Sequence, residues 1–345
     1  MGLTPKQAED RLRSDDLLGL GMEADAVRQR LHPGGVVTYI VDRNINYTNV
    51  CTECCSFCAF YRPPGSPEGY LEPLDSIFQK IEETLALGGT GVLMQGGLHP
   101  DLKIDYYENL LSSIKRRYPQ VHLHCFSSPE ILNIAEVSGL PLGETILRLR
   151  AAGLDSIPGG GAEILDDEVR RHISRRKCTT DEWLLVHRTA HQLGMRTTAT
   201  MMFGCGETLE HRANHLERIR QLQEETGGFT AFIPWIFQAA HTSLGRTVKD
   251  EATGIDYLKT LAVSRIYLDN IRNVQASWLT PGLKLCQIAL RFGGNDVGSI
   301  LIEENVVRAT GCLNRTNEEE LRRLIRDAGF RPIKRDTLYR VYFLN

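Results

Sequence analysis

Residues 36–62 read VVTYIVDRNINYTNVCTECCSFCAFYR, a strand-like run that leads into a group of cysteines. The β-branched and aromatic residues at 36–42 are typical of a buried strand. Cys51, Cys55 and Cys58 have the spacing C-x3-C-x2-C, and we expect the adjacent Cys54 to point elsewhere. A strand that leads into potential metal ligands predicts a sheet with a functional site at its strand ends.

Seven further apolar runs alternate with helical patterns along the chain. They lie at 90–95, 121–126, 154–158, 196–203, 229–237, 273–278 and 297–304. In the helical segment that begins at Pro73, Ile77 and Ile81 recur every four residues, and Gly88 is a candidate C-cap. Together with the run at 36–42, the pattern predicts an α/β fold of the (β/α)8 TIM-barrel type, with the site at the carboxyl ends of the strands.

The chain divides in the sequence into two parts of unequal size. Residues 1–35 are predicted to form an N-terminal helical extension, in which Leu12, Leu20 and Leu31 precede the stop signal HPGG. Residues 36–345 are then predicted to form the barrel, including a C-terminal helix and tail, because no linker or low-complexity segment interrupts them.

The composition narrows the class of partner. The chain of 345 residues is 42% hydrophobic and 24% charged, which is typical of a globular protein. A formal net charge of -3 provides no basic field for nucleic acid, so we expect a small-molecule substrate. No segment has the pattern of a signal peptide or of a membrane span, and we therefore expect a cytoplasmic protein without a membrane contact. The sequence indicates no oligomeric state.

The number of cysteines in the group narrows the kind of centre. A reducing cytosol disfavours disulfides. A structural zinc site needs four protein ligands, usually as two CxxC pairs, and the chain has no second pair. A 4Fe-4S cluster held by three cysteines leaves one iron open for a cofactor or substrate. The pattern favours this cluster over zinc or a disulfide.

The cysteine group, with Phe57 before its last member, resembles the hallmark motif of the radical S-adenosylmethionine (SAM) enzymes. The resemblance implies a 4Fe-4S cluster on Cys51, Cys55 and Cys58, SAM on the open iron, a 5'-deoxyadenosyl radical, and a low-potential electron donor as partner. It also implies cofactor-binding roles for Phe57, Phe60, Gln95, Gly96, Gly97, Ser128 and Glu130. An ordinary glycine turn at 96–97 and helix capping at 128–130 are the structural alternatives.

The segments IPWIFQ (233–238), QASW (275–278) and NDVGSILIEENVV (295–307) resemble the cyclic dehypoxanthinyl futalosine synthases of menaquinone biosynthesis. The resemblance implies hydrogen abstraction from dehypoxanthinyl futalosine, formation of a C–C bond, and loss of one electron and one proton. A base is then needed, and among the carboxylates at strand ends we favour Glu163 or Glu207. The candidate substrate contacts are Arg62, Trp235, Gln238, Ser277 and Asn295.

Two sites depart from the pattern of that family, and other functions remain open. Cys205 and Gly206 stand where a His-Val pair is expected, and Ala239 to His241 replace an expected proline and asparagine. An aminofutalosine synthase, or a paralogue with an altered substrate, is the alternative within the superfamily. A non-catalytic metal-binding barrel is the alternative from another class.

Overall fold

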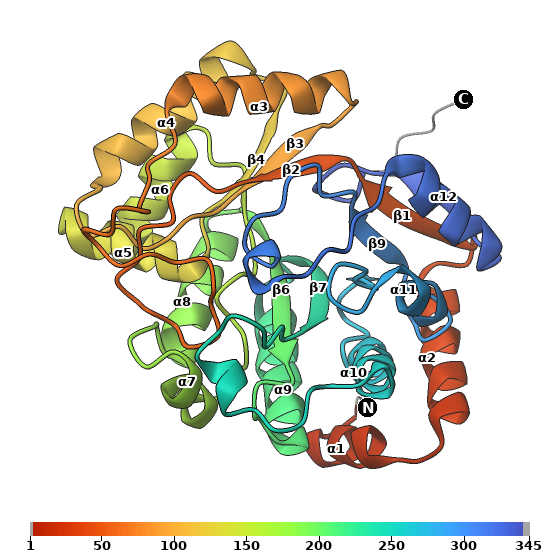
Figure 1. The fold of residues 1–345 in the computed structure, drawn as a ribbon. Coiled ribbons are helices and arrows are strands. Elements are labelled where there is room, and N and C mark those ends of the chain that lie inside the picture. The colour runs from red at the N-terminus through yellow and green to blue at the C-terminus, as the bar shows by residue number, and fades with distance from the viewer. Residues whose placement is uncertain (1–2, 341–345) are drawn as a thin grey trace.

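The computed structural model describes residues 3–340, and Figure 1 shows strands enclosed by helices. The strands are β1 (Val36–Ile40), β2 (Asp42–Ile45), β3 (Gly91–Met94), β4 (His122–Cys125), β5 (Ser156–Ile157), β6 (Arg196–Phe203), β7 (Phe229–Ile236), β8 (Asn273–Val274), β9 (Asp296–Ser299) and β10 (Arg331–Lys334). Each of the eight predicted runs contains or overlaps at least one of these strands. The TIM-like α/β fold is therefore confirmed.

The strands belong to two adjoining parallel sheets. Seven strands follow in chain order from β2 to β8, and β1 lies between β10 and β9 in a sheet of three. The two sheets adjoin because β1 continues into β2 after Val41, and because Gln275 and Asp296 form a bridge next to β8. The strands thus surround one interior, although they do not form a single uninterrupted sheet.

The first predicted strand is longer and more complex than expected. It extends to Ile45, and its two halves have different neighbours on one edge: Tyr39 pairs with Lys334 of β10, whereas Asp42 pairs with Gly91 of β3. Strand β10 was not predicted, because its sequence RPIK lacks the apolar alternation of a strand. It fills the edge of β1 that β3 does not reach.

Helices cover the outside of the strands (Figure 1). They are α3 (Leu74–Ala86), α4 (Ile104–Arg117), α5 (Ser128–Ser138), α6 (Leu142–Ala152), α7 (Asp167–Ile173), α8 (Thr180–Gln192), α9 (Leu209–Thr226), α10 (Gly254–Tyr267), α11 (Leu283–Ala289) and α12 (Glu318–Asp327). In α3, Ile77 and Ile81 are buried as predicted, and Gly88 follows the C-cap Leu87 at φ 76°. None of the helices within residues 3–340 is long and apolar enough to cross a membrane.

The N-terminal segment contains two helices, α1 (Pro5–Arg13) and α2 (Leu17–Leu31). Helix α1 contacts α9 and α10, and α2 contacts α10. The side chains of Leu12 and Leu20 are buried in the same apolar cluster as residues of β6 and β7. The helices are thus present as expected, and they cover one side of the barrel. The division into two domains at residue 35 stays a prediction.

Candidate active site

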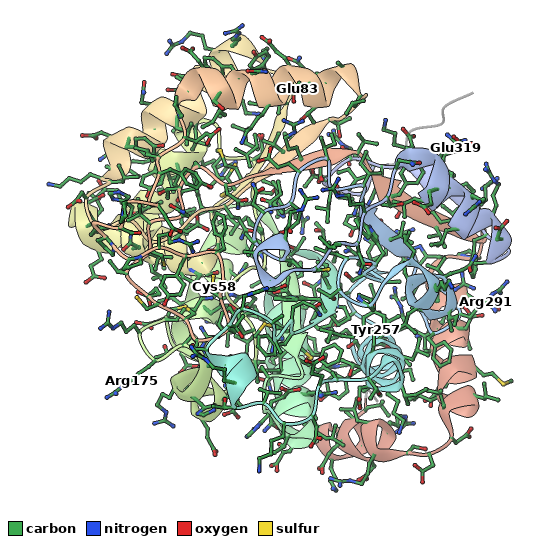
Figure 2. All side chains as sticks on the ribbon, viewed as in Figure 1. Cys58, Glu83, Arg175, Tyr257, Arg291 and Glu319 are labelled. Carbon is green, nitrogen blue, oxygen red and sulfur yellow. The ribbon has the colours of Figure 1, made fainter. Side chains whose placement is uncertain are left out.

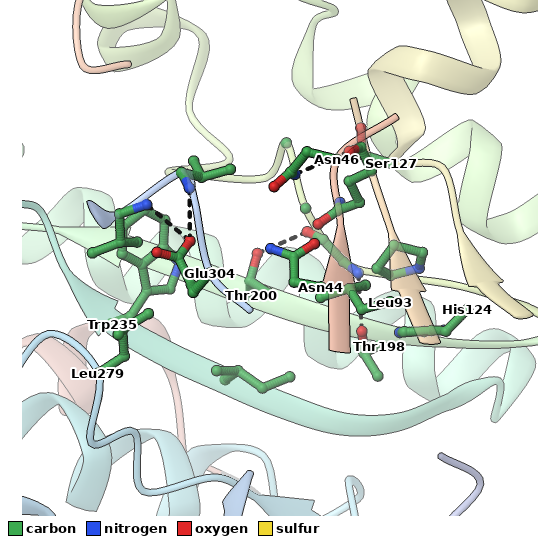
Figure 3. A pocket seen from close by; sticks show the side chains of 18 of the residues that line it. Asn44, Asn46, Leu93, His124, Ser127, Thr198, Thr200, Trp235, Leu279 and Glu304 are labelled. Atoms are coloured by element: carbon green, nitrogen blue, oxygen red, sulfur yellow. Dashed lines mark hydrogen bonds between the residues drawn. The ribbon is translucent and has the colours of Figure 1, made fainter. Parts of the chain in front are cut away.

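A cavity of about 460 Å³ lies inside the barrel, at the carboxyl ends of the strands (Figure 3). Residues from the cysteine loop and from the ends of β2 to β9 line it, and the segment after β10 contributes Arg335, Thr337 and Tyr339. Enzymes with TIM-type barrels have their active sites at this end. The structure therefore places the candidate site where the strand pattern predicts it.

The predicted cysteine ligands line this cavity together. Figure 2 shows Cys58 toward the middle of the molecule. The two ends of the loop are tied by the hydrogen bond from Cys51 N to Arg62 O, at 2.9 Å. Cys54 has a positive φ of 50°, is exposed and does not line the cavity, as expected of a cysteine that the centre does not use.

The environment of the three thiols fits a metal centre. Burial raises the pKa of Cys51 and Cys58, and it raises the pKa of Cys55 to about 12. The charges of the neighbouring cysteines raise the pKa of Cys51 and Cys55 further. Buried thiols of this kind become thiolates only beside a strong positive charge such as iron. Three such donors on one loop match a cluster that keeps one iron without a protein ligand.

The glycine pair after β3 is required by close packing. A Cβ atom on Gly97 would lie 2.2 Å from the carbonyl oxygen of Val50 and 2.9 Å from Cβ of Cys51. A Cβ atom on Gly96 would lie 2.7 Å from the ring of Tyr47. The two glycines thus bring the β3 loop directly against the cysteine loop. Gln95, Gly96 and Gly97 all line the cavity beside the thiols.

Glu130 stabilises the structure of the loops at this site. Its Oε2 accepts hydrogen bonds from N and Oγ of Ser127, at 2.7 and 2.6 Å, and forms the capping box of α5. Its Oε1 accepts from Gly96 N and from the hydroxyl of Tyr47, both at 2.9 Å. Four protein donors occupy the four acceptor positions of the carboxylate. Glu130 lines the cavity, but it fixes the glycine loop to α5 and has no acceptor position left for a cofactor.

An ion pair between Lys177 and Glu163 lies beside the cysteine loop, and the sequence analysis predicted only Glu163 as a site residue. Lys177 Nζ donates to Oε1 of Glu163; Glu163 is buried, Lys177 is partly buried, and both side chains line the cavity. The ammonium also lies 5.1 Å from the ring centroid of Phe57. Burial alone would lower the pKa of Lys177, but the charges of Glu163 and Cys55 outweigh it and raise the pKa. No sequence signal marks Lys177, which belongs to the polar segment RRK.

Two family models match the sequence. Residues 45–219 match the radical SAM superfamily, and residues 226–344 match the CofH/MqnC C-terminal region. The first match covers more than half of the chain and contains the loop with the three thiols. The chain belongs to the radical SAM superfamily. Enzymes of this superfamily use a 4Fe-4S cluster and SAM. Membership in the superfamily therefore confirms the two cofactors that the sequence predicts.

Curated relatives of this radical SAM enzyme span nearly the whole chain. The cyclic dehypoxanthine futalosine synthase of Halalkalibacterium halodurans is 46% identical over 98% of this chain and 91% of its own length. That of Streptomyces coelicolor is 44% identical over 98% and 85%. The 5-amino-6-(D-ribitylamino)uracil–L-tyrosine 4-hydroxyphenyl transferase of Archaeoglobus fulgidus is 44% identical over 96% of both chains. All three relatives are named as enzymes.

Solved structures agree on the fold. Methylornithine synthase superimposes with a TM-score of 0.75 at 19% identity, over 96% of this chain and 94% of that one. The FeFe-hydrogenase maturase HydG of Carboxydothermus hydrogenoformans has a TM-score of 0.75 at 16% identity, over 98% and 78%. At these identities the likeness establishes the fold and nothing finer.

Five predicted site residues of this radical SAM enzyme do not line the cavity, and the first is the predicted base Glu207. Its oxygens accept from Arg212 Nε at 2.7 Å and from the backbone N of Gly204 and Cys205, both at 2.8 Å. The carboxylate therefore holds the turn between β6 and α9. The assignment of Glu207 as a base stays a prediction, and Cys205, one of the departures from the family pattern, belongs to the same turn.

Three predicted substrate contacts also lie outside the cavity lining, and their role stays a prediction. Arg62 pairs with Glu68 at 2.5 Å and donates to backbone carbonyls of its own loop. Gln238 donates to the carbonyls of the two preceding residues. Asn295 accepts from the buried Arg265 at 2.5 Å and from Val274 N at 2.9 Å. The partners of Arg62 and Gln238 are local, whereas those of Asn295 are more than 20 residues away in the chain. A sequence without coordinates cannot distinguish residues bound in this way from ligand-binding residues.

Ser128, a predicted cofactor contact, is the fifth predicted residue outside the cavity lining, and its role stays a prediction. It is fully buried in the first turn of α5, and its Oγ hydrogen-bonds Nε2 of His187 at 2.9 Å. It does not line the cavity. The structural alternative, in which this segment begins a helix, applies to Ser128.

Trp235 and Ser277 do line the cavity, together with Phe57 and Phe60. Trp278, the neighbour of Ser277, also lines it and donates from Nε1 to Ser299 O at 2.9 Å. Aromatic walls of this kind suit a flat, ring-containing ligand.

A belt of polar side chains on the strands was missed. Figure 3 shows Asn44 of β2, His124 of β4, and Thr198 and Thr200 of β6 around the cavity. The buried Oδ1 of Asn44 has no hydrogen-bond partner among residues 3–340. In β4 and β6 these residues alternate with apolar ones, and a period of two on a barrel strand points one set inward. That alternation is the signal that could have found them.

Proposed function

We propose that this radical SAM enzyme converts dehypoxanthinyl futalosine to cyclic dehypoxanthinyl futalosine in menaquinone biosynthesis. The main support is 46% identity, over 98% of the chain, to a cyclic dehypoxanthine futalosine synthase. A cavity lined by the three cysteines and by aromatic and polar side chains agrees with such a substrate.

In this proposal Cys51, Cys55 and Cys58 hold the 4Fe-4S cluster. The ammonium of Lys177 complements the carboxylate of SAM, and Glu163 complements its ammonium or hydroxyl groups. When bound, the two cofactors supply the one-electron chemistry that removes a hydrogen atom from the substrate. Phe57 and Phe60 cover the approach to the cysteine loop and exclude water.

The substrate would lie deeper in the barrel, between the aromatic wall and the polar belt. Trp235 and Ser277 stay candidate substrate contacts, because both line the cavity. The unpaired Oδ1 of Asn44 would accept a hydroxyl hydrogen of the substrate, which removes the cost of an unsatisfied buried acceptor. Of the two predicted bases, Glu163 alone reaches the cavity.

The proposal also includes the surroundings of the enzyme. We infer a low-potential electron donor as partner, as radical SAM chemistry requires, and a location in the cytoplasm, where a reducing environment keeps the nine cysteines free.

The decisive experiment is an anaerobic assay of the reconstituted enzyme with dithionite, SAM and dehypoxanthinyl futalosine, followed by mass spectrometry. We expect a product that has lost two hydrogens, together with 5'-deoxyadenosine. The absence of that product would contradict the proposal.

A second candidate function follows from the transferase of Archaeoglobus fulgidus, because its identity of 44% is close to that of the synthases. The same assay with L-tyrosine and 5-amino-6-(D-ribitylamino)uracil tests it. An adduct of these two compounds, without the cyclised product, would favour the transferase. The aminofutalosine synthase alternative would instead give no product from dehypoxanthinyl futalosine.

A further inference from the structure

Three side chains form a hydrogen-bonded column inside the barrel, below the cavity. His122 and His124 are two residues apart on β4 and therefore point to the same face, and Ser156 of β5 is the register partner of His124. The hydroxyl of Ser156 lies 2.6 Å from Nδ1 of His124 and 2.7 Å from Nε2 of His122. The column connects two imidazoles through one buried oxygen.

The two ends of the column have different surroundings. His124 lines the cavity (Figure 3), and its Nε2 is neither a buried atom nor bonded to any group within residues 3–340. His122 lies at the first residue of β4, is half-buried and does not line the cavity. The column thus runs from the cavity toward the amino-terminal end of the barrel.

The hydroxyl couples the tautomers of the two rings. Ser156 has one hydrogen, so with two ring nitrogens in reach it donates to one and accepts from the other. If it donates to His122, then Nδ1 of His124 carries a hydrogen and Nε2 of His124 presents a lone pair to the cavity. In this arrangement Nε2 of His124 can accept a proton while the hydrogen on Nδ1 can move to Ser156.

Burial fixes how a proton can pass. Burial first, and then the charges of His122 and Arg335, lower the pKa of His124 to about 3, so an isolated imidazolium is disfavoured in the cavity. A proton that enters at Nε2 must therefore leave from Nδ1 in the same event. Burial also lowers the pKa of His122, against the charge of Asp155, so His122 releases a proton readily to water. Lys115, Asp336 and Arg340 are the other charged groups that act on His122.

Three cavity carboxylates that could compete for this role are committed elsewhere. Glu163 is paired with Lys177, and Glu130 accepts four hydrogen bonds. Glu304 accepts from the backbone N of Val306, Val307 and Arg308. Asp42 and Glu53 also line the cavity, and each has a buried oxygen without a partner among residues 3–340. His124 differs from them because side-chain hydrogen bonds lead from its ring away from the cavity, through Ser156 to His122.

We propose that His124 accepts the proton that the cyclised radical intermediate loses, and that Ser156 and His122 conduct it to the amino-terminal end of the barrel. The inference rests on the proposed function. A C–H bond of the intermediate breaks and its proton binds Nε2 of His124; the hydrogen on Nδ1 moves to Ser156 Oγ, and the serine hydrogen moves to His122. One proton leaves to water, and the electron passes to a one-electron acceptor of the iron–sulfur class.

The test compares Ser156→Ala and His122→Ala with the wild type and measures cyclised product and 5'-deoxyadenosine separately. We expect product formation to fall by about 100-fold, within the contribution of positioned proton transfer, while 5'-deoxyadenosine still forms. Added imidazole should restore product in His122→Ala, which a purely structural role would not explain. His172→Ala, on the exposed surface of α7, is the matched control and should match the wild type with or without imidazole.

A second readout needs no turnover. Nitrogen-15 NMR of labelled histidine should show the same Nδ1–H tautomer for His122 and His124, and Ser156→Ala should abolish this coupling. Normal product yield in both variants, or independent tautomers, would overturn the proton path. If the wild type itself makes no cyclised product, the proposed function fails, whereas the tautomer result still reports on the column.

Discussion

Two ion pairs lie at the cavity, Lys177 with Glu163 near the cysteines and Arg335 with Asp296 at the floor. They differ in how many of the hydrogen-bond donors of the cation have a protein acceptor. Near the cysteines, Lys177 Nζ has one hydrogen-bond acceptor within residues 3–340, Glu163, although an ammonium can donate three hydrogen bonds. At the floor, Arg335 donates from Nε and NH2 to the two oxygens of Asp296, at 2.5 and 2.9 Å.

The floor pair is further enclosed. Asp296 also accepts from Thr38 Oγ1 at 2.5 Å and Gly298 N at 2.8 Å, and the guanidinium of Arg335 lies 3.9 Å from the ring centroid of Tyr339. A satisfied network of this kind holds a fold together, whereas an ammonium with spare donors is prepared for a ligand. Burial alone therefore does not distinguish a ligand-binding ion pair from a structural one, whereas the number of hydrogen-bond donors without a protein acceptor does.

The largest expected effect concerns the cysteine loop beside Lys177. Cys55→Ala removes a cluster ligand, so we expect loss of the 4Fe-4S absorption, of bound iron and of all 5'-deoxyadenosine formation. Cys54→Ala is the matched control, because Cys54 is exposed and turned away, and it should keep iron and activity. An iron-loaded, active Cys55→Ala would refute the ligand assignment.

The next test neutralises each pair without leaving a lone charge. Lys177→Met combined with Glu163→Gln should lower 5'-deoxyadenosine formation by on the order of 100-fold, because the cofactor loses its positioning groups. Arg335→Met combined with Asp296→Asn should leave that rate near the wild-type value. Equal losses in the two double variants would break the distinction between the pairs.

Removing only one partner of the floor pair tests its structural role. Arg335→Met leaves the fully buried Asp296 carboxylate without its cation, and we expect a loss of about 3–5 kcal/mol in the free energy of unfolding. Urea denaturation measures it. The double variant Arg335→Met with Asp296→Asn should recover most of the loss, and no recovery would mean that packing, rather than charge, dominates.

A smaller effect comes from buried neutral histidines. Burial lowers the pKa of His215 and of His124 to about 3, from about 6.5 in the unfolded chain. The unfolded state therefore binds more protons below pH 6.5, and stability is lost as the pH falls from there toward 3. Each histidine contributes about 1.4 kcal/mol per pH unit. Urea midpoints of the cluster-free protein at pH 7.5 and 5.5 should differ, and His215→Gln should reduce the slope.

Local patterns in the sequence predicted much of the fold. Eight strand-like runs, the buried face of α3 and the cysteine spacing each depend on neighbouring residues, and the structure agrees with all three. Strand β10 escaped because its stability comes from pairing with β1, far away in the chain, rather than from its own pattern RPIK.

The site was predicted in part, for the same reason. Cys51, Gly97 and Glu163 lie next to recognisable motifs, and they line the cavity. Glu207 and Asn295 are equally polar, but each accepts a hydrogen bond from an arginine, Arg212 and Arg265 respectively. Only coordinates reveal such partners. Lys177 was missed because its role depends on its ion pair with Glu163, which the sequence alone does not show.

The placement of β10 beside β1 also governs how the molecule can assemble. The first strand of the barrel shares one edge with a strand from residues 331–334, and Arg335 next to it forms the floor under the cavity. During synthesis, β1 must wait with an unpaired edge until almost the entire chain has been made. Closure of the active site is therefore a late event in folding, of high contact order, and the waiting edge is the part of the nascent chain most exposed to wrong pairing.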